Sequence, residues 1–298
     1  MKPSRSEFIK VRGLTTHLRH WGAPQAPIVV MMHGWMDVSA SFQFVVDCLQ
    51  NDWHVIAADW RGFGRTEPCG ADSYWFLDYL GDLDAILQHC SPTAPVALLG
   101  HSMGGNVVTL YAGVRPNRVH RLINLEGFGM PVTQPEQAPG RYEKWLDELR
   151  APAEMRTYPT QAAVASRLQK NNPRLTDARA AFLSGQWAAP NDAGEWEILA
   201  DPAHKLSSPI LYRVEEVLAC WKRIDAPVLW VEAAQTDVWR WMGPKESARL
   251  EIDRRIACIP RVTTAMIEDA GHMLHHDQPE ILARLIEDFL RPPLYNGA

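Results

Sequence analysis

The fold is decided by the stretch Val96-Ala97-Leu98-Leu99-Gly100-His101-Ser102-Met103-Gly104-Gly105, an apolar run that breaks into the pattern Gly-x-Ser-x-Gly and continues as a helical segment. A strand, a tight turn and a helix form the context in which such a serine is a nucleophile. A serine hydroxyl is a weak nucleophile in water, so it must be held exposed, beside a base and near an oxyanion site. Side chains two positions before and after the serine would collide in this turn, which explains Gly100 and Gly104. The pattern predicts that Ser102 is catalytic.

The rest of the chain alternates short apolar runs with helical patterns. Short all-apolar strands separated by amphipathic helices are typical of a parallel sheet that is covered on both faces. The first two strands are expected to form a hairpin. Strands are expected at 8–13, 15–21, 28–32, 54–58, 96–100, 119–125, 227–232 and 263–267, and helices at 39–50, 74–90, 105–113, 244–256 and 279–290.

The alternation is interrupted by a long segment without a strand candidate. Between residues 131 and 221 the sequence has only helical pieces separated by Pro- and Asn-rich turns. We therefore expect one α/β core formed by residues 1–130 and 222–298, with a helical cap inserted at 131–221. The expected cap helices lie at 141–150, 161–170, 178–184 and 214–222.

Composition excludes several classes of partner. The chain has 298 residues, 46% of them hydrophobic, and a net charge of −5 without a basic stripe. Neither nucleic acid nor an anionic membrane surface is therefore an expected partner, and a small molecule is. The N-terminus has no apolar leader, and no run approaches the roughly 18 apolar residues of a spanning helix. We expect a cytoplasmic location.

The five cysteines are widely separated and form no Cys-x-x-Cys pair, and no paired histidine spacing accompanies them. Neither a disulfide framework nor a zinc site is therefore expected. We predict no metal and no cofactor. The sequence carries no signal for an oligomeric state.

A second motif, His33-Gly34-Trp35-Met36-Asp37, follows the expected strand at 28–32. A glycine at this position lets the backbone turn an N–H group toward the space above the sheet edge. Preorganised N–H donors stabilise the oxyanion of an acyl-transfer intermediate, each by about 3 to 4 kcal/mol. The candidates are the backbone N–H groups of Trp35 and Met103. Gly34, Trp35 and Trp239 are expected to border the substrate.

His272 is the expected base, because it follows the last strand on a loop with Gly271, at the same sheet edge as Ser102. His275 and His276 lie closer to the last helix, where surface or capping roles are expected. His101 is expected to pack under the turn, since its side chain diverges from that of Ser102.

An imidazole base needs a carboxylate to hold its tautomer. Asp237, on the loop after the strand at 227–232, is the first choice, in the chain order Ser, Asp, His. Glu126, which closes the strand at 119–125, is the alternative, and Glu232 is a third candidate. On another loop, Asp59 and Arg61 are expected to fix the backbone beside the oxyanion site rather than to bind an anion.

Taken together, these motifs resemble those of the α/β-hydrolase superfamily in order and spacing over nearly the whole chain. The matching residues are His33-Gly34, Asp59-x-Arg61-Gly62-x-Gly64, Gly100-x-Ser102-x-Gly104-Gly105, Asp237 and Gly271-His272. Residues 33–37, 39–42, 99–105 and 167–173 are also similar to the serine-hydrolase-like proteins, a capped branch near epoxide hydrolases and esterases.

The resemblance implies a mostly parallel sheet of about eight strands with a lid over a Ser-His-acid site. One departure is that residues 232–237 lack the glycine of the family's Gly-x-x-Asp pattern. Glu126 therefore stays open as the acid, since some capped relatives carry the acid after the earlier strand.

The identity of the nucleophile limits the reaction. Relatives that open epoxides or remove halides attack an sp³ carbon with a carboxylate, whereas a serine would form an ether that water cannot cleave. Ser102 therefore implies acyl transfer, and a small to medium apolar carboxylic ester is the expected substrate. Lactones, thioesters, carbon-carbon hydrolysis and perhydrolysis remain alternatives. A non-catalytic binding protein on the same fold is the alternative from another class.

Overall fold

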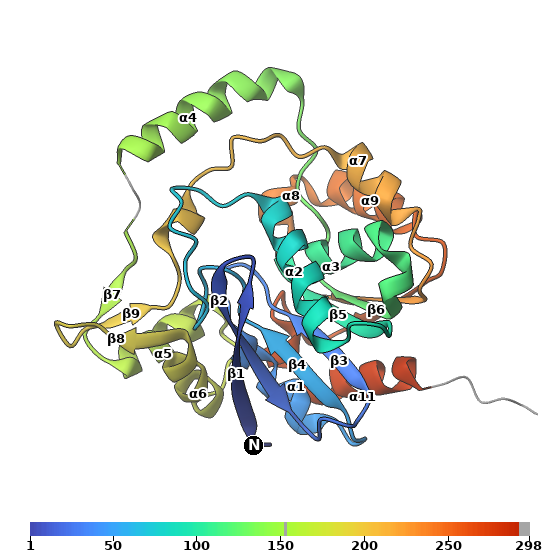
Figure 1. Ribbon diagram of the computed structural model, residues 1–298. Helices are drawn as coiled ribbons and strands as arrows, with labels where there is room; N and C mark the ends of the chain where they lie inside the picture. Colours follow the sequence, from blue (N-terminus) through green and yellow to red (C-terminus); the bar gives the residue numbers. More distant parts are fainter. Residues whose placement is uncertain (152–153, 292–298) are drawn as a thin grey trace, which may run out of the picture.

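An eight-stranded sheet forms the centre of the molecule in the computed structural model, which describes residues 1–151 and 154–291 (Figure 1). The strand order is β1-β2-β4-β3-β5-β6-β10-β11. The β1–β2 hairpin and the β2–β4 pair are antiparallel, and the other pairs are parallel. The mostly parallel sheet expected from the sequence is confirmed. Its strands are β1 (Ser4–Val11), β2 (Leu14–Trp21), β3 (Ile28–Met32), β4 (His54–Ala58), β5 (Val96–His101), β6 (Val119–Leu125), β10 (Val228–Ala233) and β11 (Val262–Ile267).

Both faces of the sheet are covered by helices. Along β3, Val30 and Met32 belong to the core beneath α2, α3 and α9, whereas Val29 and Met31 belong to the core beneath α1 and α11. This alternation follows from the two-residue period of a strand, and it explains why every residue of such a strand is apolar. The elements are η1 (Ser39–Phe42), α1 (Gln43–Cys48), α2 (Phe76–Cys90), α3 (Met103–Val114), η2 (Pro116–Arg118), α8 (Trp239–Met242), α9 (Lys245–Ile256), α10 (Leu274–Asp277) and α11 (Pro279–Leu290).

The segment between β6 and β10 contains both helices and strands. The sequence predicts no strand there, and this is wrong: three short strands form a second sheet in the order β7-β9-β8. Each has only two or three residues, too few for a period-two pattern. The elements are η3 (Pro135–Gln137), α4 (Ala138–Arg150), β7 (Thr157–Tyr158), α5 (Gln161–Asn171), α6 (Asp177–Trp187), β8 (Ala188–Pro190), β9 (Trp196–Ile198), η4 (Pro202–Lys205) and α7 (Val214–Trp221).

These elements do not all pack in the same way. Helices α5 and α6 have a small apolar core of their own, which includes Val164, Leu168 and Leu183 and takes in Phe44 from α1. Helix α7 instead packs on α3, where Leu218 and Trp221 join the main core. Helix α4 lies apart from the sheet, across one end of the molecule (Figure 1).

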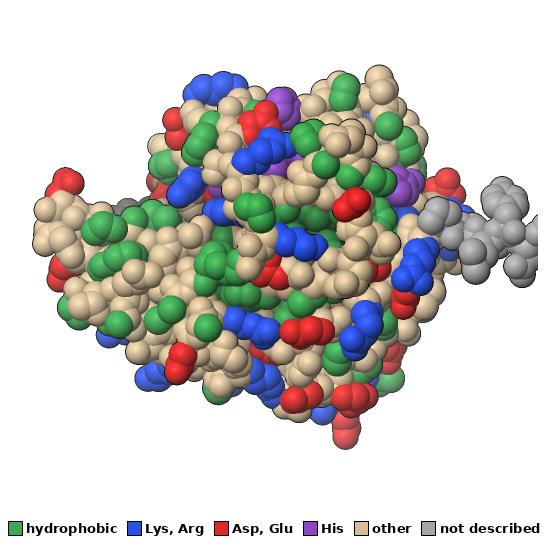
Figure 2. All heavy atoms as spheres, turned by 90° about the horizontal axis from the view of Figure 1, so that it is seen from below, with side chains coloured by type: hydrophobic (Ala, Val, Ile, Leu, Met, Phe, Trp, Pro, Cys, Tyr) green, Lys and Arg blue, Asp and Glu red, His purple; other side chains and the backbone are tan. Residues whose placement is uncertain are grey.

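The absence of a basic stripe, expected from the sequence, agrees with the face of the molecule shown in Figure 2. Acidic and basic side chains are interspersed over the face shown in Figure 2, and neither sign dominates it. Among residues 1–151 and 154–291, no helix has the length and apolar character needed to cross a bilayer.

The turn between β5 and α3 is packed so closely that two of its positions accept only glycine. A Cβ atom at Gly104 would overlap the carbonyl oxygen of Met32 and lie 2.6 Å from that of His33. A Cβ atom at Gly100 would overlap the backbone of Gly104. The steric reason given for these two glycines from the sequence is thus confirmed.

We expect Gly104→Ala to lower the free energy of unfolding by about 2 to 3 kcal/mol or more, because the added methyl group meets backbone atoms that cannot move aside. The urea midpoint measures this change. Gly140→Ala is the control, since a Cβ atom there meets nothing within 4 Å in α4. It should leave stability unchanged or raise it by up to about 1 kcal/mol. Equal effects of the two substitutions would contradict the packing argument.

Candidate active site

Ser102 lies where β5 ends and α3 begins, in a conformation that few side chains adopt. Its φ is 51° and its ψ is −114°. Two backbone hydrogen bonds hold it there: its N–H donates to the carbonyl of Leu125 at 2.8 Å, and its carbonyl accepts from the N–H of Asn106 at 2.9 Å. Such strain costs on the order of 1 to 3 kcal/mol, so the surrounding contacts must offset it. The hydroxyl is thereby presented at the carboxyl edge of the sheet.

His272, on the loop between β11 and α10, faces this hydroxyl. Its Nε2 atom lies 3.0 Å from Oγ of Ser102. Its backbone carbonyl accepts a hydrogen bond at 2.8 Å from Nε2 of His101, whose side chain is buried under the turn. The expected places of His272 and His101 are thus both found. His101 thus precedes Ser102 in the sequence and also supports His272, whose imidazole faces Ser102.

Glu126 lies on the other side of His272. Its Oε2 atom is 3.2 Å from Nδ1 of His272, and its side chain is fully buried. The carboxylate also accepts hydrogen bonds from the backbone N–H of Ala233, at 2.8 Å, and from the hydroxyl of Thr236. Glu126 has a positive φ of 57°, and Asn124 braces its turn by accepting from the N–H of Gly127. Three donors therefore orient this carboxylate.

The expected contact between Asp237 and His272 is not made. The Asp237 side chain is 42% exposed and pairs with Arg240 at 3.1 Å. After β10 ends, the turn directs Thr236 inward to Glu126 and leaves its neighbour Asp237 facing outward. This first choice from the sequence is therefore wrong as a partner of the base, and the alternative, Glu126, takes its place.

Glu232, the third candidate acid, is also occupied elsewhere. Its carboxylate binds Arg249 on α9. Burial raises the pKa of Glu232, and Arg249 only partly opposes this. No hydrogen bond joins Glu232 to His272 among the described residues. Ser102, His272 and Glu126 are thus the three side chains that the fold brings into one chain of hydrogen bonds.

The loop after β3 runs beside Ser102. A Cβ atom at Gly34 would lie 3.0 Å from Nδ1 of His101 and 3.2 Å from Cβ of Ser102, so a larger residue there would require these side chains to shift. Within residues 1–151 and 154–291, the backbone N–H groups of Trp35 and Met103 donate to no other group. Both are therefore available as donors, which is what an oxyanion site needs. Met36 adds a further positive φ, of 55°, to this loop.

A cavity of about 250 Å³ opens above Ser102 and His272. Gly34 and Trp35 lie in its wall, as expected, but Trp239 does not. Trp239 packs on the main core, with Nζ of Lys245 5.6 Å from its ring centroid. Trp241, two residues further along the chain, lies edge-on to His272 with 5.4 Å between ring centroids. The apolar part of the wall comes from Leu168, Leu175, Leu183, Trp187 and Met273.

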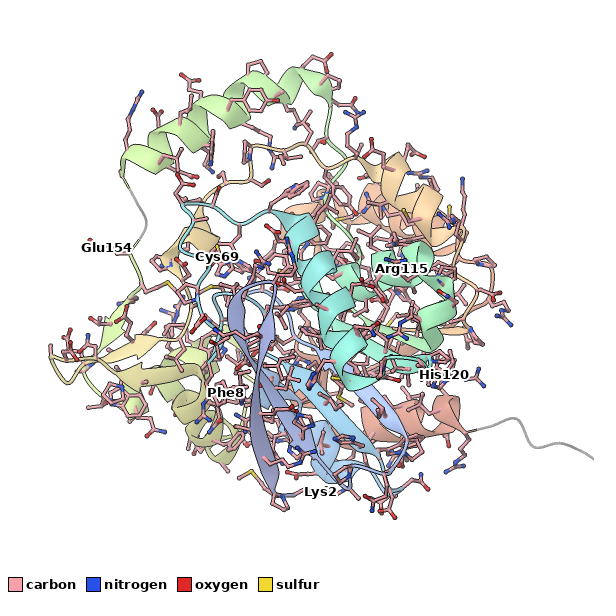
Figure 3. The ribbon with its side chains drawn as sticks, in the orientation of Figure 1. Lys2, Phe8, Cys69, Arg115, His120 and Glu154 are labelled. Carbon is pink, nitrogen blue, oxygen red and sulfur yellow. The ribbon has the colours of Figure 1, made fainter. Side chains whose placement is uncertain are left out.

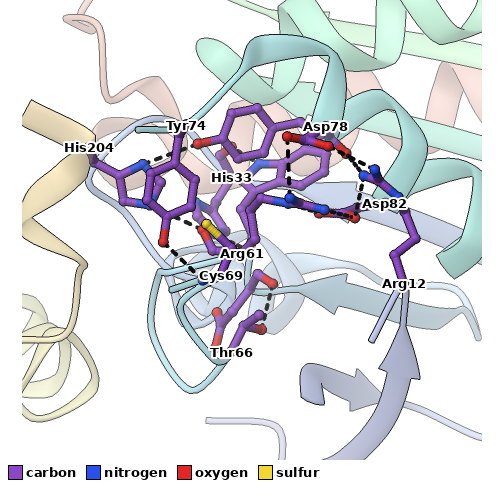
Figure 4. Close-up of polar contacts among 12 residues, drawn as sticks. Arg12, His33, Arg61, Thr66, Cys69, Tyr74, Asp78, Asp82 and His204 are labelled. Carbon is purple, nitrogen blue, oxygen red and sulfur yellow. Dashed lines mark hydrogen bonds and ion pairs between the residues drawn. The ribbon is translucent and has the colours of Figure 1, made fainter. Parts of the chain in front are cut away.

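The loop after β4 has the structural role expected of it. Asp59 accepts from the backbone N–H of Ser39 at 2.6 Å and of Arg65 at 3.0 Å, and it contacts Nδ1 of His17 at 2.7 Å. Arg61 makes two hydrogen bonds to Asp82, at 2.5 and 2.6 Å (Figure 4). Arg61 is therefore engaged within the protein rather than presented to a ligand.

His204, on η4, joins the 131–221 segment to this loop. Its ring is stacked between Phe63 and Tyr74, with 3.8 and 3.6 Å between ring centroids. Figure 4 shows His204 beside Tyr74. Burial lowers the pKa of His204 to about 4, so the ring is neutral at pH 7. Within the 131–221 segment itself, Nζ of Lys205 donates a hydrogen bond to the carbonyl of Glu154 at 2.6 Å. Figure 3 shows Glu154 at the outer side of this region.

The sequence model for the alpha/beta hydrolase fold matches residues 27–279. The chain belongs to the α/β-hydrolase family.

Two curated relatives and one solved structure extend this finding. This α/β hydrolase is 26% identical to a serine hydrolase-like protein of Danio rerio, over 91% of this chain and 84% of that protein. It is 25% identical to the 3-hydroxybutyrate-oligomer hydrolase of Cupriavidus necator, over 93% and 92% of the two chains. Its fold is similar to the thioesterase domain from the curacin biosynthetic pathway, with a TM-score of 0.84, 25% identity and coverage of 96% and 99%. A hydrolase is therefore the class that these relatives support.

Sequence reasoning missed several polar residues of this α/β hydrolase. Thr236 holds the carboxylate of Glu126, and His275 and His276 are buried rather than at the surface. A hydroxyl next to a candidate acid is too common a pattern to single out Thr236. The pair His275-His276, three and four residues after His272, is a usable signal, because both histidines lie in α10, a helix of only four residues.

Asp59 makes the stability of the site's supporting loop depend on pH. Burial raises the pKa of Asp59, but the hydrogen bond to His17 and nearby charges outweigh this and lower it from 3.8 to about 2. The resulting stabilisation is present above about pH 4 and is lost as the pH falls toward 2, by roughly 2 kcal/mol. We expect the urea midpoint of Asp59→Asn to fall less steeply than that of the wild type between pH 5 and 2. Asp52→Asn, at an exposed aspartate, should keep the wild-type slope, and parallel curves for all three would refute the assignment.

Proposed function

We propose that the protein is a serine hydrolase that cleaves a small to medium apolar carboxylic ester through an acyl-enzyme on Ser102. One observation carries the proposal: Oγ of Ser102 lies 3.0 Å from Nε2 of His272, whose Nδ1 lies 3.2 Å from the buried carboxylate of Glu126. A nucleophile, a base and a group that orients the base are the parts that acyl transfer needs.

In the proposed mechanism, His272 accepts the hydroxyl proton as Ser102 attacks the carbonyl carbon. The oxyanion of the tetrahedral intermediate accepts hydrogen bonds from the backbone N–H groups of Trp35 and Met103. His272 then gives its proton to the departing alcohol, which leaves an acyl group on Ser102. A water molecule, activated by His272, hydrolyses the acyl-enzyme and restores the hydroxyl.

Glu126 acts on the imidazole rather than on the substrate. Accepting a hydrogen bond from Nδ1–H leaves the lone pair on Nε2, which is the tautomer that can take a proton from Ser102. The carboxylate also stabilises the imidazolium that forms during the reaction. Its three hydrogen-bond donors are His272, Ala233 and Thr236. They keep it in place without a contact to solvent.

The cavity supports an apolar acyl group of limited size. The 131–221 segment contributes four apolar side chains and two asparagines to its wall: Leu168, Leu175, Leu183, Trp187, Asn171 and Asn172. We propose that this segment is a cap that selects the substrate. The name of the Cupriavidus necator relative supports an ester, because oligomers of a hydroxy acid are joined by ester bonds. The likeness to a thioesterase domain favours an acyl thioester as the second candidate.

The serine hydrolase proposal is tested by covalent labelling. A fluorophosphonate should modify Ser102 in stoichiometric amount, and the wild type should hydrolyse p-nitrophenyl butyrate, whereas Ser102→Ala should do neither. Intact mass and peptide mapping locate the label. If Ser102 stays unmodified and neither an acyl ester nor an acyl thioester is hydrolysed, the protein is a binding protein on this fold.

The acid is tested by a pair of isosteric substitutions. Glu126→Gln should lower kcat for the ester by roughly 100-fold or more, because the amide no longer holds the required tautomer or charge. Asp237→Asn is the matched control and should change kcat by no more than about twofold, the usual effect at an exposed position. A larger loss with Asp237→Asn than with Glu126→Gln would overturn the assignment.

A further inference from the structure

Three buried polar side chains meet beside the candidate active site without a part in the proposed acyl transfer. Asp37 follows β3, His101 ends β5 and His275 lies in α10, so three distant parts of the chain contribute. One nitrogen or oxygen atom from each lies within 4.8 Å of the other two. The relative exposures are 4%, 1% and 0%. We call these residues the Asp37 cluster.

Each side chain of the Asp37 cluster has at least one buried polar atom without a hydrogen-bond partner among the described residues. These atoms are Oδ2 of Asp37, Nδ1 of His101 and both ring nitrogens of His275. Nε2 of His275 is 3.8 Å from Oδ2 of Asp37, too far for a hydrogen bond. A buried polar atom left without a partner costs about 1 to 3 kcal/mol. Unpartnered polar atoms from three buried side chains in one place therefore indicate that a bound species is held between them.

The neighbouring hydrogen bonds define the ligand type that each side chain offers. His101 faces a carbonyl with Nε2, so Nε2 carries the proton and Nδ1 presents a lone pair to the cluster. Oδ1 of Asp37 accepts from the hydroxyl of Ser41, which leaves Oδ2 free. The cluster thus combines imidazole lone pairs with a carboxylate.

We propose that the Asp37 cluster binds one divalent transition metal ion of the zinc class, through Oδ2 of Asp37, Nδ1 of His101 and one ring nitrogen of His275. Two imidazoles and a carboxylate suit Zn²⁺ or a neighbouring transition metal, whereas Ca²⁺ and Mg²⁺ prefer oxygen ligands alone. Asp37 and His101 also lie in the wall of the cavity, which gives the ion a route of entry. The sequence predicts no metal site, because these three residues have no motif spacing.

The closing experiment measures binding of Zn²⁺ alone to the full chain, by competition with a chromogenic chelator. We expect one ion per chain in the wild type, and a loss of affinity of at least about 100-fold in His275→Gln and in Asp37→Asn. His89→Gln, at a half-exposed histidine of α2 far from the cluster in sequence, is the matched control and should bind like the wild type. Circular dichroism checks that each variant is folded.

A second measurement covers the case in which a variant fails to fold. Co²⁺ added to the wild type should give intense visible absorption bands of a four-coordinate ion at one equivalent, and Zn²⁺ should remove them. Absence of stoichiometric binding, or affinity that is unchanged in both cluster variants, would overturn the proposal and leave water as the bound species. Both readouts are independent of ester hydrolysis, so they do not share their outcome with the labelling of Ser102.

Discussion

The close approach of α3 to the end of β3 is the contact on which the rest of the structure depends. Gly104 lies against the carbonyl groups of Met32 and His33, so the chain must turn within the single residue Ser102. The positive φ of that residue follows from this geometry. It places the hydroxyl at the edge where β6 and β11 end, within reach of Glu126 and His272. Backbone packing in the sheet, rather than the polar side chains, thus determines where the serine lies.

Much of the core could be predicted from the sequence because its strands are buried on both faces. The run at 28–32 and the run at 54–58 contain almost only apolar residues, and the bounds of β3 and β4 agree with them. Strands β7, β8 and β9 carry no such pattern, since pairing with one another stabilises segments of two or three residues. They become strands only because the fold brings them together.

The positions of Ser102 and His272 beside each other could likewise be predicted, whereas the carboxylate that contacts His272 could not. Ser102 and His272 follow from local motifs at strand ends. The choice between Glu126 and Asp237 depends on whether Thr236 or Asp237 faces inward in the turn after β10. If the turn were shifted by one residue, Asp237 would face inward instead. The same applies to Trp239 and Trp241, of which only the second lies against His272. Which of two neighbouring side chains in a turn faces inward depends on the tertiary structure. A single sequence does not encode this in a readable pattern.

The position of Glu126 directly after β6 has a consequence for how this protein can diverge. In the loop after β10, Glu126 accepts hydrogen bonds from the backbone of Ala233 and the hydroxyl of Thr236, and that hydroxyl accepts from the N–H of Val238 at 3.4 Å. Among the described residues, none of 239–243 donates a hydrogen bond to the carboxylate, although Trp241 lies edge-on to His272. A substitution at Trp241 changes the surroundings of His272 while these hydrogen bonds to Glu126 stay intact. The exposed end of this short segment can therefore change in sequence without releasing the carboxylate.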